Sequence, residues 1–199
     1  MKIAFVGAHG TGKTTLTEII AAAYGYTLIP EGAREVLAKY QLRGDVRGAD
    51  KDTILQIQSE ITQNFRDNYE KAIESRNVVA DRCIVDCYAY GLSRLSEYNL
   101  AKSYLAKLHD EVKEKKDHFD IYFLIPPLLP LRADKIRDDN EQYQSHIHHL
   151  IKGILYAHHY YVHEIETVSF YDRISEVRGA ITKKEHESGH SQSESLSNS

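Results

Sequence analysis

The sequence predicts an α/β fold in which one parallel β-sheet is covered by helices on both faces. Short apolar runs rich in β-branched residues recur along the 199 residues, and longer stretches with helical patterning separate them. Strands that are apolar on both faces and alternate with helices are typical of parallel sheets, and right-handed crossovers then give a doubly wound layer. With 42% hydrophobic and 27% charged residues, the chain can bury one sizeable core, which excludes a wholly disordered protein.

The predicted elements follow in order along a single domain, residues 1–184. The expected strands are residues 2–6, 26–30, 78–81, 121–125 and, with the weakest pattern, 167–170. The expected helices are residues 12–24, 33–40, 50–75, 86–116, 140–165 and 172–184. Half of the residues from Ser188 to Ser199 are serine and only Leu196 is apolar, so residues 185–199 are predicted to form a disordered, Ser-rich tail.

Charge and cysteine content narrow the function classes. The formal net charge is −4, and residues 185–199 hold three acids but no Lys or Arg, so the remaining body has a formal charge of −1. Non-specific coating of nucleic acid depends on neutralising phosphates, so a nearly neutral body argues against it.

Cys83 and Cys87 do not have the C-x-x-C spacing of a redox or zinc pair. With no apolar run of roughly 20 residues and no room for a signal peptide, we expect a cytoplasmic protein without a membrane partner.

A phosphate-binding loop is the most specific motif in the chain. Residues 7–14, GAHGTGKT, match the whole pattern G-x-x-x-x-G-K-[ST] between a predicted strand and a predicted helix. Glycines let backbone N–H groups turn inward around phosphate oxygens, and the N-terminus of the following helix adds partial positive charge. Lys13 then reaches the β- and γ-phosphates, and the hydroxyl of Thr14 binds Mg²⁺. We therefore expect ATP and Mg²⁺ as cofactors, with the nucleotide held by Gly7, Ala8, His9, Gly10, Thr11, Gly12, Lys13, Thr14 and Thr15.

Charged side chains also follow the strand that is predicted at residues 78–81. This apolar strand ends in Asp81, which at the carboxyl edge of a parallel sheet is placed to hold Mg²⁺ or its water. Arg82 adds a cation where negative charge develops on a transferred phosphoryl group. Asp86 is interpreted as the cap of the next helix rather than as a ligand.

A second carboxylate follows the strand at residues 26–30. Glu31 lies beside a glycine at the carboxyl end of that strand, so we interpret it as a general base for an acceptor hydroxyl rather than as a helix cap. Arg34, three residues further on, either binds an anionic part of the acceptor or is solvated.

A proline-rich segment after the fourth strand predicts a lid at about residues 128–145. Three prolines end the strand, and three cations within six residues open a long helix. Arginines in such a lid close over a triphosphate and exclude water, although alternating charge is also typical of a solvated surface. Arg137 is the predicted catalytic arginine, and Arg132 is predicted to bind the nucleotide.

Together these motifs resemble those of P-loop nucleoside and nucleotide kinases. The resemblance is carried by GAHGTGKT (7–14), PEGARE (30–35), VVADR (78–82) with Asp86 and Tyr90-Gly91, and IPPLLPLRADKIRDD (125–139). It is closest to the group containing the nicotinamide-riboside kinase domain of NadR-type proteins, and looser to thymidylate and deoxynucleoside kinases. The chain departs from the pattern at Lys135, where relatives often have Gly, and in having no second Arg after Arg137 in the lid.

The resemblance has implications for fold and mechanism. It implies a three-layer P-loop NTPase fold with a five-stranded parallel sheet in the order 2-3-1-4-5 and a helical lid. It also implies that Glu31 or Asp81 activates the acceptor hydroxyl, while Arg82 and Arg137 contact phosphates. In similar kinases the helix expected at residues 50–75 lines the acceptor pocket, where this chain has Gln56, Gln58, Gln63, Asn64, Arg66 and Tyr69.

The leading hypothesis is an ATP-dependent kinase acting on a hydroxyl or phosphate of a nucleoside-type acceptor. That acceptor is a nucleoside, a nucleoside monophosphate, or a hydroxymethylated thymine-type base in DNA, for which Arg43, Arg47 and Lys51 could form a basic strip. The alternative is a nucleotide-hydrolysing ATPase or GTPase switch acting on a protein partner. No guanine-reading Asn/Thr-Lys-x-Asp motif supports this alternative.

Overall fold

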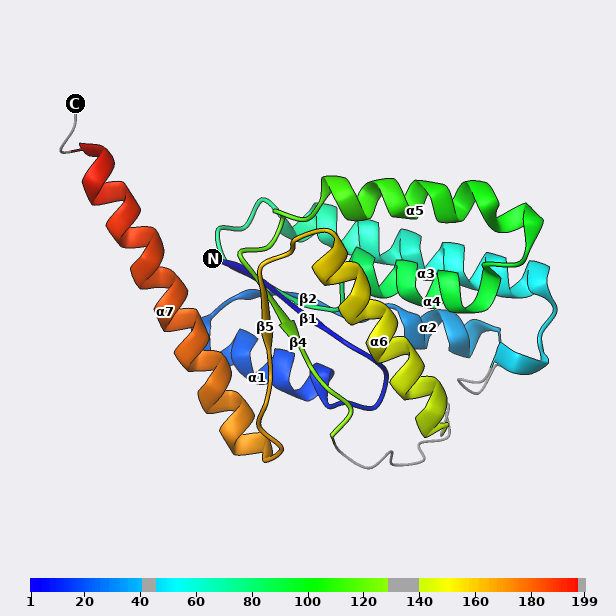
Figure 1. Cartoon of the computed structure of the whole chain (residues 1–199), viewed down its shortest axis with the longest axis horizontal. Coiled ribbons are helices and arrows are strands. Elements are labelled where there is room, and N and C mark those ends of the chain that lie inside the picture. Colours follow the sequence, from blue (N-terminus) through cyan, green and yellow to red (C-terminus); the bar gives the residue numbers. More distant parts are fainter. Residues whose placement is uncertain (41–45, 129–139, 197–199) are drawn as a thin grey trace.

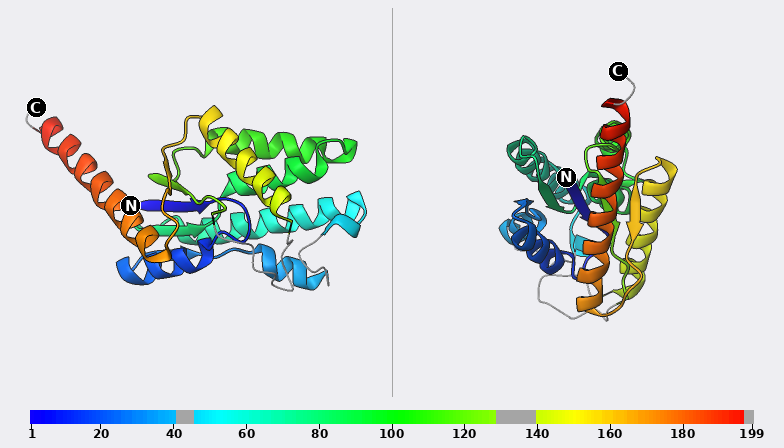
Figure 2. Two further views of the ribbon diagram at one scale, coloured as in Figure 1. Left: turned by 60° about the horizontal axis from the view of Figure 1, so that its bottom comes forward. Right: turned by 90° about the vertical axis from the view of Figure 1, so that its left-hand side faces the viewer.

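The fold is three-layered, with one sheet between two layers of helices (Figures 1 and 2). The computed structural model describes residues 1–40, 46–128 and 140–196. The five strands are β1 (Lys2–Val6), β2 (Thr27–Ile29), β3 (Val78–Asp81), β4 (Ile121–Leu124) and β5 (Val162–Glu164). They are all parallel and lie in the order β2-β3-β1-β4-β5, which confirms the predicted sheet.

Seven α-helices and two short 3₁₀ helices are present in the described part of the chain. The α-helices are α1 (Lys13–Tyr24), α2 (Ala33–Lys39), α3 (Lys51–Ala72), α4 (Ile84–Leu95), α5 (Lys102–Glu114), α6 (Glu141–Ala157) and α7 (Phe170–Leu196). The 3₁₀ helices are η1 (Val46–Gly48) and η2 (Asn99–Ala101).

Alternate side chains of the central strand enter two different cores. Ala4 and Val6 belong to the core that faces α3, α4, α5 and α6. Ile3 and Phe5 belong to the core that faces α1 and α7. Because successive side chains of a strand point to opposite faces, a strand buried on both faces must be apolar, as β1 is from Ile3 to Val6.

The parallel arrangement brings the carboxyl ends of the strands to one edge of the sheet. Phe5 of β1 pairs with Asp81 of β3, and Ile29 of β2 pairs with Ala80. The residues that follow β1, β2 and β3 are therefore neighbours in space although they are far apart in the sequence. In open parallel sheets ligands bind outside this edge.

The position of the fifth strand was wrongly predicted. Residues 167–169 lie in the loop that leads into α7, which begins at Phe170. The strand lies earlier, at Val162–Glu164, after α6 has already ended at Ala157. This strand has only three residues, and it pairs with β4 alone. Because it is a half-exposed edge strand that includes His163 and Glu164, it lacks the apolar run by which buried strands are recognised.

The helix predicted at residues 86–116 is two helices, α4 and α5, joined through η2. No glycine or proline marks the break between Leu95 and Lys102, so local sequence patterns do not reveal it. The two helices pack closely where a Cβ added to Gly91 would lie 3.2 Å from Cδ2 of Leu105. The break is therefore fixed by packing between the helices rather than by a helix-breaking residue.

The C-terminal helix also differs from the sequence prediction. Helix α7 spans Phe170–Leu196, whereas the sequence predicts a helix over residues 172–184. Its second half extends away from the body in all views of Figures 1 and 2. None of the helices in the described ranges is both long and apolar enough to cross a membrane.

Glu176 on α7 stabilises the segment between β5 and α7 through hydrogen bonds to its carboxylate. Its carboxylate accepts hydrogen bonds from the backbone N–H of Glu166 and of Thr167 and from the Thr167 hydroxyl, at 3.1, 3.2 and 2.7 Å. Burial opposes ionisation, but these hydrogen bonds, with one from His163, lower the pKa of Glu176 below its usual value. The ionised carboxylate therefore stabilises the folded state.

We predict that Glu176→Gln destabilises the protein by about 2 kcal/mol at pH 7, the size expected for hydrogen bonds to a charged acceptor. Because the folded-state pKa is lowered, this stability is present above the unfolded pKa of about 4.3. The difference from wild type should shrink as the pH falls through the lower folded-state value. Urea unfolding between pH 7 and pH 3 measures it, with Glu185→Gln on the same helix as the control. A pH-independent difference would contradict this account.

Candidate active site

The phosphate loop has the backbone conformation that its glycines allow. The φ angles of Gly7, Gly10 and Gly12 are 142°, 74° and 86°, values that residues with a Cβ rarely adopt. At Gly7 a Cβ would also lie only 2.6 Å from the carbonyl oxygen of Ile125. Helix α1 begins directly after Gly12, and the amide of Leu16 bonds back to the Gly12 carbonyl. The amides that open α1 before Leu16 lack intrahelical partners, so this end of the helix suits an anion.

Lys13 lies within the loop. Its Nζ donates to the carbonyl of Ala8 at 2.5 Å and to the hydroxyl of Thr11 at 3.2 Å. Burial, together with the charge of Arg82, lowers the pKa of Lys13 to about 8 although nearby carboxylates oppose the shift. Anionic phosphate oxygens would favour the charged form of this lysine.

Asp81 ends β3 beside the loop and has the surroundings of a metal ligand. Its side chain is 3% exposed, and neither carboxylate oxygen meets a hydrogen-bond donor at bonding distance and angle among the described residues. Burial and the charge of Glu31 raise the pKa of Asp81, while the nearby Thr14 hydroxyl and Lys13 oppose the rise. A buried carboxylate without a partner needs a cation or water, and Mg²⁺ prefers oxygen ligands. Thr14 and Asp81 therefore fit the Mg²⁺ that the sequence predicts.

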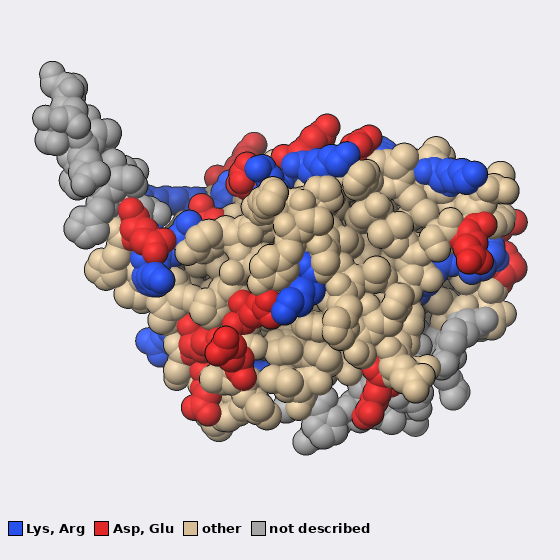
Figure 3. Space-filling model, viewed as in Figure 1, with Lys and Arg blue, Asp and Glu red and all other residues tan. Residues whose placement is uncertain are grey.

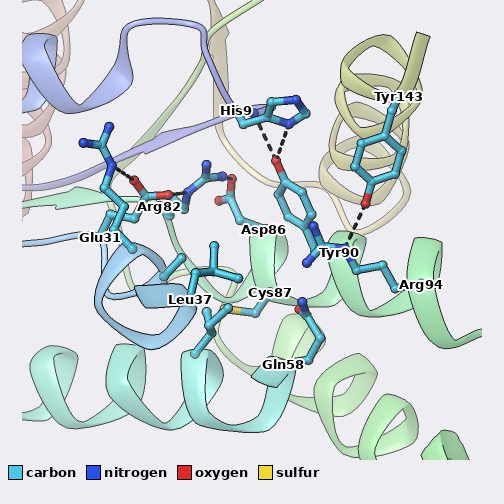
Figure 4. Close-up of a pocket in the computed structure, with 13 residues that line it drawn as sticks. His9, Glu31, Leu37, Gln58, Arg82, Asp86, Cys87, Tyr90, Arg94 and Tyr143 are labelled. Carbon is cyan, nitrogen blue, oxygen red and sulfur yellow. Dashed lines mark hydrogen bonds and ion pairs between the residues drawn. The ribbon is translucent and has the colours of Figure 1, made fainter. Parts of the chain in front are cut away.

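Arg82 connects the loop with two carboxylates (Figure 4). Its Nε donates to Oε1 of Glu31 at 2.5 Å, and its Nη1 donates to Oδ1 of Asp86 and to the carbonyl of Gly7, both at 3.1 Å. The φ angle of Arg82 is 83°, in the left-handed region, where a non-glycine residue is strained. Residues in such conformations cluster at functional sites.

The environments of Glu31 and Asp81 move the pKa values of these two carboxyls in opposite directions. Burial would raise the pKa of Glu31, but the charges of Arg82, Lys13 and Arg34 outweigh it and the net shift is downward. The pKa of Asp81 is raised. Opposite shifts of neighbouring carboxyls are typical of sites in which the two groups have different roles.

Asp86 caps α4, as predicted, and also contacts the loop. Its Oδ2 accepts from the N–H of Cys83 at 3.1 Å, and its Oδ1 accepts from the N–H of Gly7 at 3.2 Å. The side chain is fully buried, so the same carboxylate fixes the start of the helix and the start of the phosphate loop.

A cleft with an empty volume of about 710 Å³ opens beside these residues (Figure 4). Glu31, Arg82 and Asp86 lie at one end of it. Its other lining residues are His9, Ala33, Arg34, Leu37, Gln58, Ile61, Cys87, Tyr90, Arg94 and Tyr143. Gln58 is 2% exposed, and its Nε2 has no hydrogen-bond partner in the described part of the chain. Apolar walls with a few polar groups are typical of small-molecule sites.

The structure brings most of the predicted site residues together. Residues 7–15, Glu31, Asp81 and Arg82 meet at the carboxyl edge of the sheet, whereas Arg132 and Arg137 lie outside the described residues. Arg34 is half-exposed and lies 3.7 Å from Glu31 at the rim of the cleft. On α3, by contrast, Gln63 bonds to Asp67 and Arg66 bonds to Glu111, so neither belongs to the cleft lining.

Arg173 on α7 contacts the phosphate loop, and the sequence alone does not predict this contact. The residue is 1% exposed, its Nη1 donates to the carbonyl of Thr11 at 2.9 Å, and its Nε donates to the carbonyl of Thr167 at the same distance. Arg173 therefore ties the phosphate loop to the turn after β5. The two partners are 162 residues apart, and an arginine on a polar helix gives no sign of burial until its partner is known.

Comparisons with known proteins agree with this architecture. A protein-family model described as an AAA domain matches residues 2–173. Deoxyadenosine kinase from M. mycoides with bound dATP is 18% identical, with a TM-score of 0.67 over 92% of this chain and 99% of that chain. NadR protein in complex with NR is 16% identical, with a TM-score of 0.68 over 92% of this chain and 50% of that chain. Thymidylate kinase from Ehrlichia chaffeensis is 20% identical, with a TM-score of 0.59 over 92% of this chain and 98% of that chain. No curated protein matches the sequence significantly.

These likenesses confirm the resemblance that the motifs indicated. At such low identity they establish the fold, and the roles of individual residues rest on the geometry described above.

We predict that Arg173→Lys weakens nucleotide binding about tenfold, because a lysine cannot reproduce the two hydrogen bonds that the planar guanidinium donates. Isothermal titration with Mg²⁺ and AMP-PNP measures the affinity. Arg178→Lys, an exposed arginine on the same helix, is the matched control. Equal affinities of the two variants would show that the contact with Thr11 does not matter for binding.

Proposed function

The chain belongs to the AAA domain family, and we propose that it is an ATP- and Mg²⁺-dependent kinase that transfers the γ-phosphoryl group to a hydroxyl or phosphate of a nucleoside-type acceptor. One observation carries the proposal. The pocket over the phosphate loop and the acceptor cleft are separate, yet Glu31, Arg34 and Arg82 line both of them. Transfer between two bound substrates requires such a junction, because it brings the reacting groups together in line.

The residues at the junction have distinct proposed roles. The loop amides and Lys13 hold the phosphates, and Arg82 stabilises the negative charge that develops during transfer. Glu31 accepts a hydrogen bond, and finally the proton, from the acceptor hydroxyl. Its lowered pKa keeps it ionised at neutral pH but makes it a weak base, so orientation of the hydroxyl is its larger contribution. Arg137 and Arg132 are proposed to contact phosphates because of their position in the predicted lid, and for Arg137 the family resemblance also implies this contact.

Thr14 and Asp81 would hold Mg²⁺, directly or through water. When bound, the ion neutralises charge on the β- and γ-phosphate oxygens.

The acceptor cleft suits a planar heterocycle. Leu37, Ile61 and Cys87 provide apolar walls, and burial raises the pKa of the Cys87 thiol to about 12, so this cysteine is inert at neutral pH. Gln58 also lines the cleft, and its amide has an N–H donor without a partner among the described residues. A ring nitrogen or carbonyl of a nucleobase would satisfy that donor, since buried polar groups need partners.

We favour a small acceptor over polymeric DNA, because the described residues give the suggested basic strip no support. Lys51 of the suggested basic strip donates to the carbonyl of Arg94. Arg43 and the side chain of Arg47 lie outside the described residues. On the face shown in Figure 3, described acidic and basic side chains are intermixed and form no continuous basic strip.

Acceptor dependence distinguishes the proposal from a hydrolytic switch. ADP release from Mg²⁺ and ATP should be measured alone and with nucleosides, nucleoside monophosphates, nicotinamide riboside, and DNA with and without hydroxymethylated bases. The proposal predicts that one class of acceptor stimulates ADP release strongly. Equal release with and without every acceptor would refute transfer and favour the switch.

We predict that Lys13→Ala lowers kcat/KM by about a thousandfold, because a preorganised cation is lost from the transferred phosphates. Glu31→Gln should lower kcat by about a hundredfold, the lower end of general-base effects, with nucleotide affinity retained. Steady-state kinetics and equilibrium titration separate the two effects. An unchanged kcat in Glu31→Gln would remove Glu31 from the mechanism.

We predict that Gln58→Leu raises the KM for the acceptor about tenfold without weakening nucleotide binding, because only the acceptor loses a hydrogen-bond partner. Gln63→Leu on the same helix is the matched control, because Gln63 bonds to Asp67 and does not line the cleft. If both variants behave like wild type, Gln58 does not bind the acceptor.

A further inference from the structure

We infer that Tyr90 is a positioning residue for the phosphate loop. Together with Gln144, it holds the backbone of the loop residue His9. This inference rests on the proposed function only in requiring that the loop binds a nucleotide. It assigns a role to two side chains that lie outside the phosphate-loop motif.

Both polar backbone groups of His9 bond to side chains from other elements. The N–H of His9 donates to the hydroxyl oxygen of Tyr90 on α4 at 3.0 Å, and the same hydroxyl lies 3.0 Å from Nδ1 of His9 (Figure 4). The carbonyl of His9 accepts from Nε2 of Gln144 on α6 at 2.7 Å. Gln144 is 4% exposed. Two helices thus fix one residue in the middle of the loop.

Tyr90 belongs to a row of side chains on one face of α4. Asp86, Tyr90 and Arg94 follow one another at intervals of four residues, which places them on the same side of the helix, and Arg82 lies just before α4 begins. Two members of this row accept from the loop, because Asp86 binds the amide of Gly7 and Tyr90 binds the amide of His9. Protein groups therefore hold the first half of the loop. The amides at the start of α1 remain suited to phosphate.

The tyrosine ring is itself held in place. The guanidinium carbons of Arg82 and Arg94 lie 5.4 and 5.0 Å from its centroid, within the range of cation–π contacts. Its hydroxyl is therefore presented to His9 in a fixed position. The ring also lines the acceptor cleft, so Tyr90 contacts both this cleft and the phosphate loop.

A fixed hydroxyl matters because the loop is rich in glycine. Without anchors, Gly7 and Gly10 can adopt many backbone conformations, few of which direct the amides toward a phosphate. When only a fraction of molecules is competent to bind, the apparent Kd equals the intrinsic Kd divided by that fraction, so the apparent affinity is lower. Tyr90 and Gln144 would then strengthen nucleotide binding without touching the nucleotide.

The test removes the Tyr90 hydroxyl and leaves the ring. In isothermal titration of the full chain with Mg²⁺ and AMP-PNP, Tyr90→Phe should raise the Kd about tenfold, and Gln144→Leu should act in the same direction. Tyr88→Phe is the matched control, because its ring lies on the same helix but stacks against His109. In hydrogen exchange, the amides of residues 7–11 should exchange faster in Tyr90→Phe, while those of α4 keep their wild-type rates.

Each outcome decides the question. A Kd for Tyr90→Phe within twofold of wild type would overturn the inference, as would an equal loss of affinity in Tyr88→Phe or faster exchange throughout α4, because these would show general loosening of the helix. If Tyr90→Phe alone binds weakly but no acceptor receives phosphate from the wild-type protein, the inference stands and the proposed transfer fails. If the wild-type chain binds no nucleotide, both fail.

Discussion

The guanidinium of Arg82 holds together the parts of the molecule on which the site depends. Its contacts join the end of β1 at Gly7, the end of β2 at Glu31 and the start of α4 at Asp86. The backbone N–H of the same residue donates to the carbonyl of Phe5 at 2.9 Å. Its left-handed conformation costs on the order of 1–3 kcal/mol and persists only because the surroundings fix it. Buried carboxylates need partners, so loss of Arg82 would remove the cation that Glu31 and Asp86 share, although Asp86 would keep its backbone N–H donors and Glu31 its contact with Arg34.

This arrangement separates the tasks of two neighbouring carboxylates. Glu31 bonds to Arg82 and stays ionised, which suits a group that orients and then accepts a proton. Asp81 is buried next to Thr14 without a hydrogen-bond donor of its own in the described chain, which suits a group that is completed by a cation. A purely hydrolytic protein would need Asp81 to hold the cation. The cleft on the far side of Glu31, with its unpartnered amide at Gln58, has no role in hydrolysis but would be filled by the proposed acceptor.

Features that short segments determine could be predicted from the sequence, and features that depend on distant partners could not. The phosphate loop was predictable because Gly7, Gly10 and Gly12 dictate their own backbone, and Asp81 because it ends a buried strand. The fifth strand was misplaced because its three half-exposed edge residues form no apolar run. The break between α4 and α5 was missed because it contains no glycine or proline. The contacts of Arg173 and Gln144 with the loop were missed because both residues lie on helices whose polar residues look solvated until the tertiary structure buries them.

Following the γ-phosphoryl group of labelled ATP tests the central claim most directly. The protein, with Lys13→Ala as the inactive control, is incubated with γ-labelled ATP, Mg²⁺ and each acceptor, and the products are separated and counted. The account predicts that label moves from ATP into one nucleoside-type acceptor in proportion to the ADP formed. Label that appears only as free phosphate, whichever acceptor is present, would contradict it and would identify a nucleotide hydrolase.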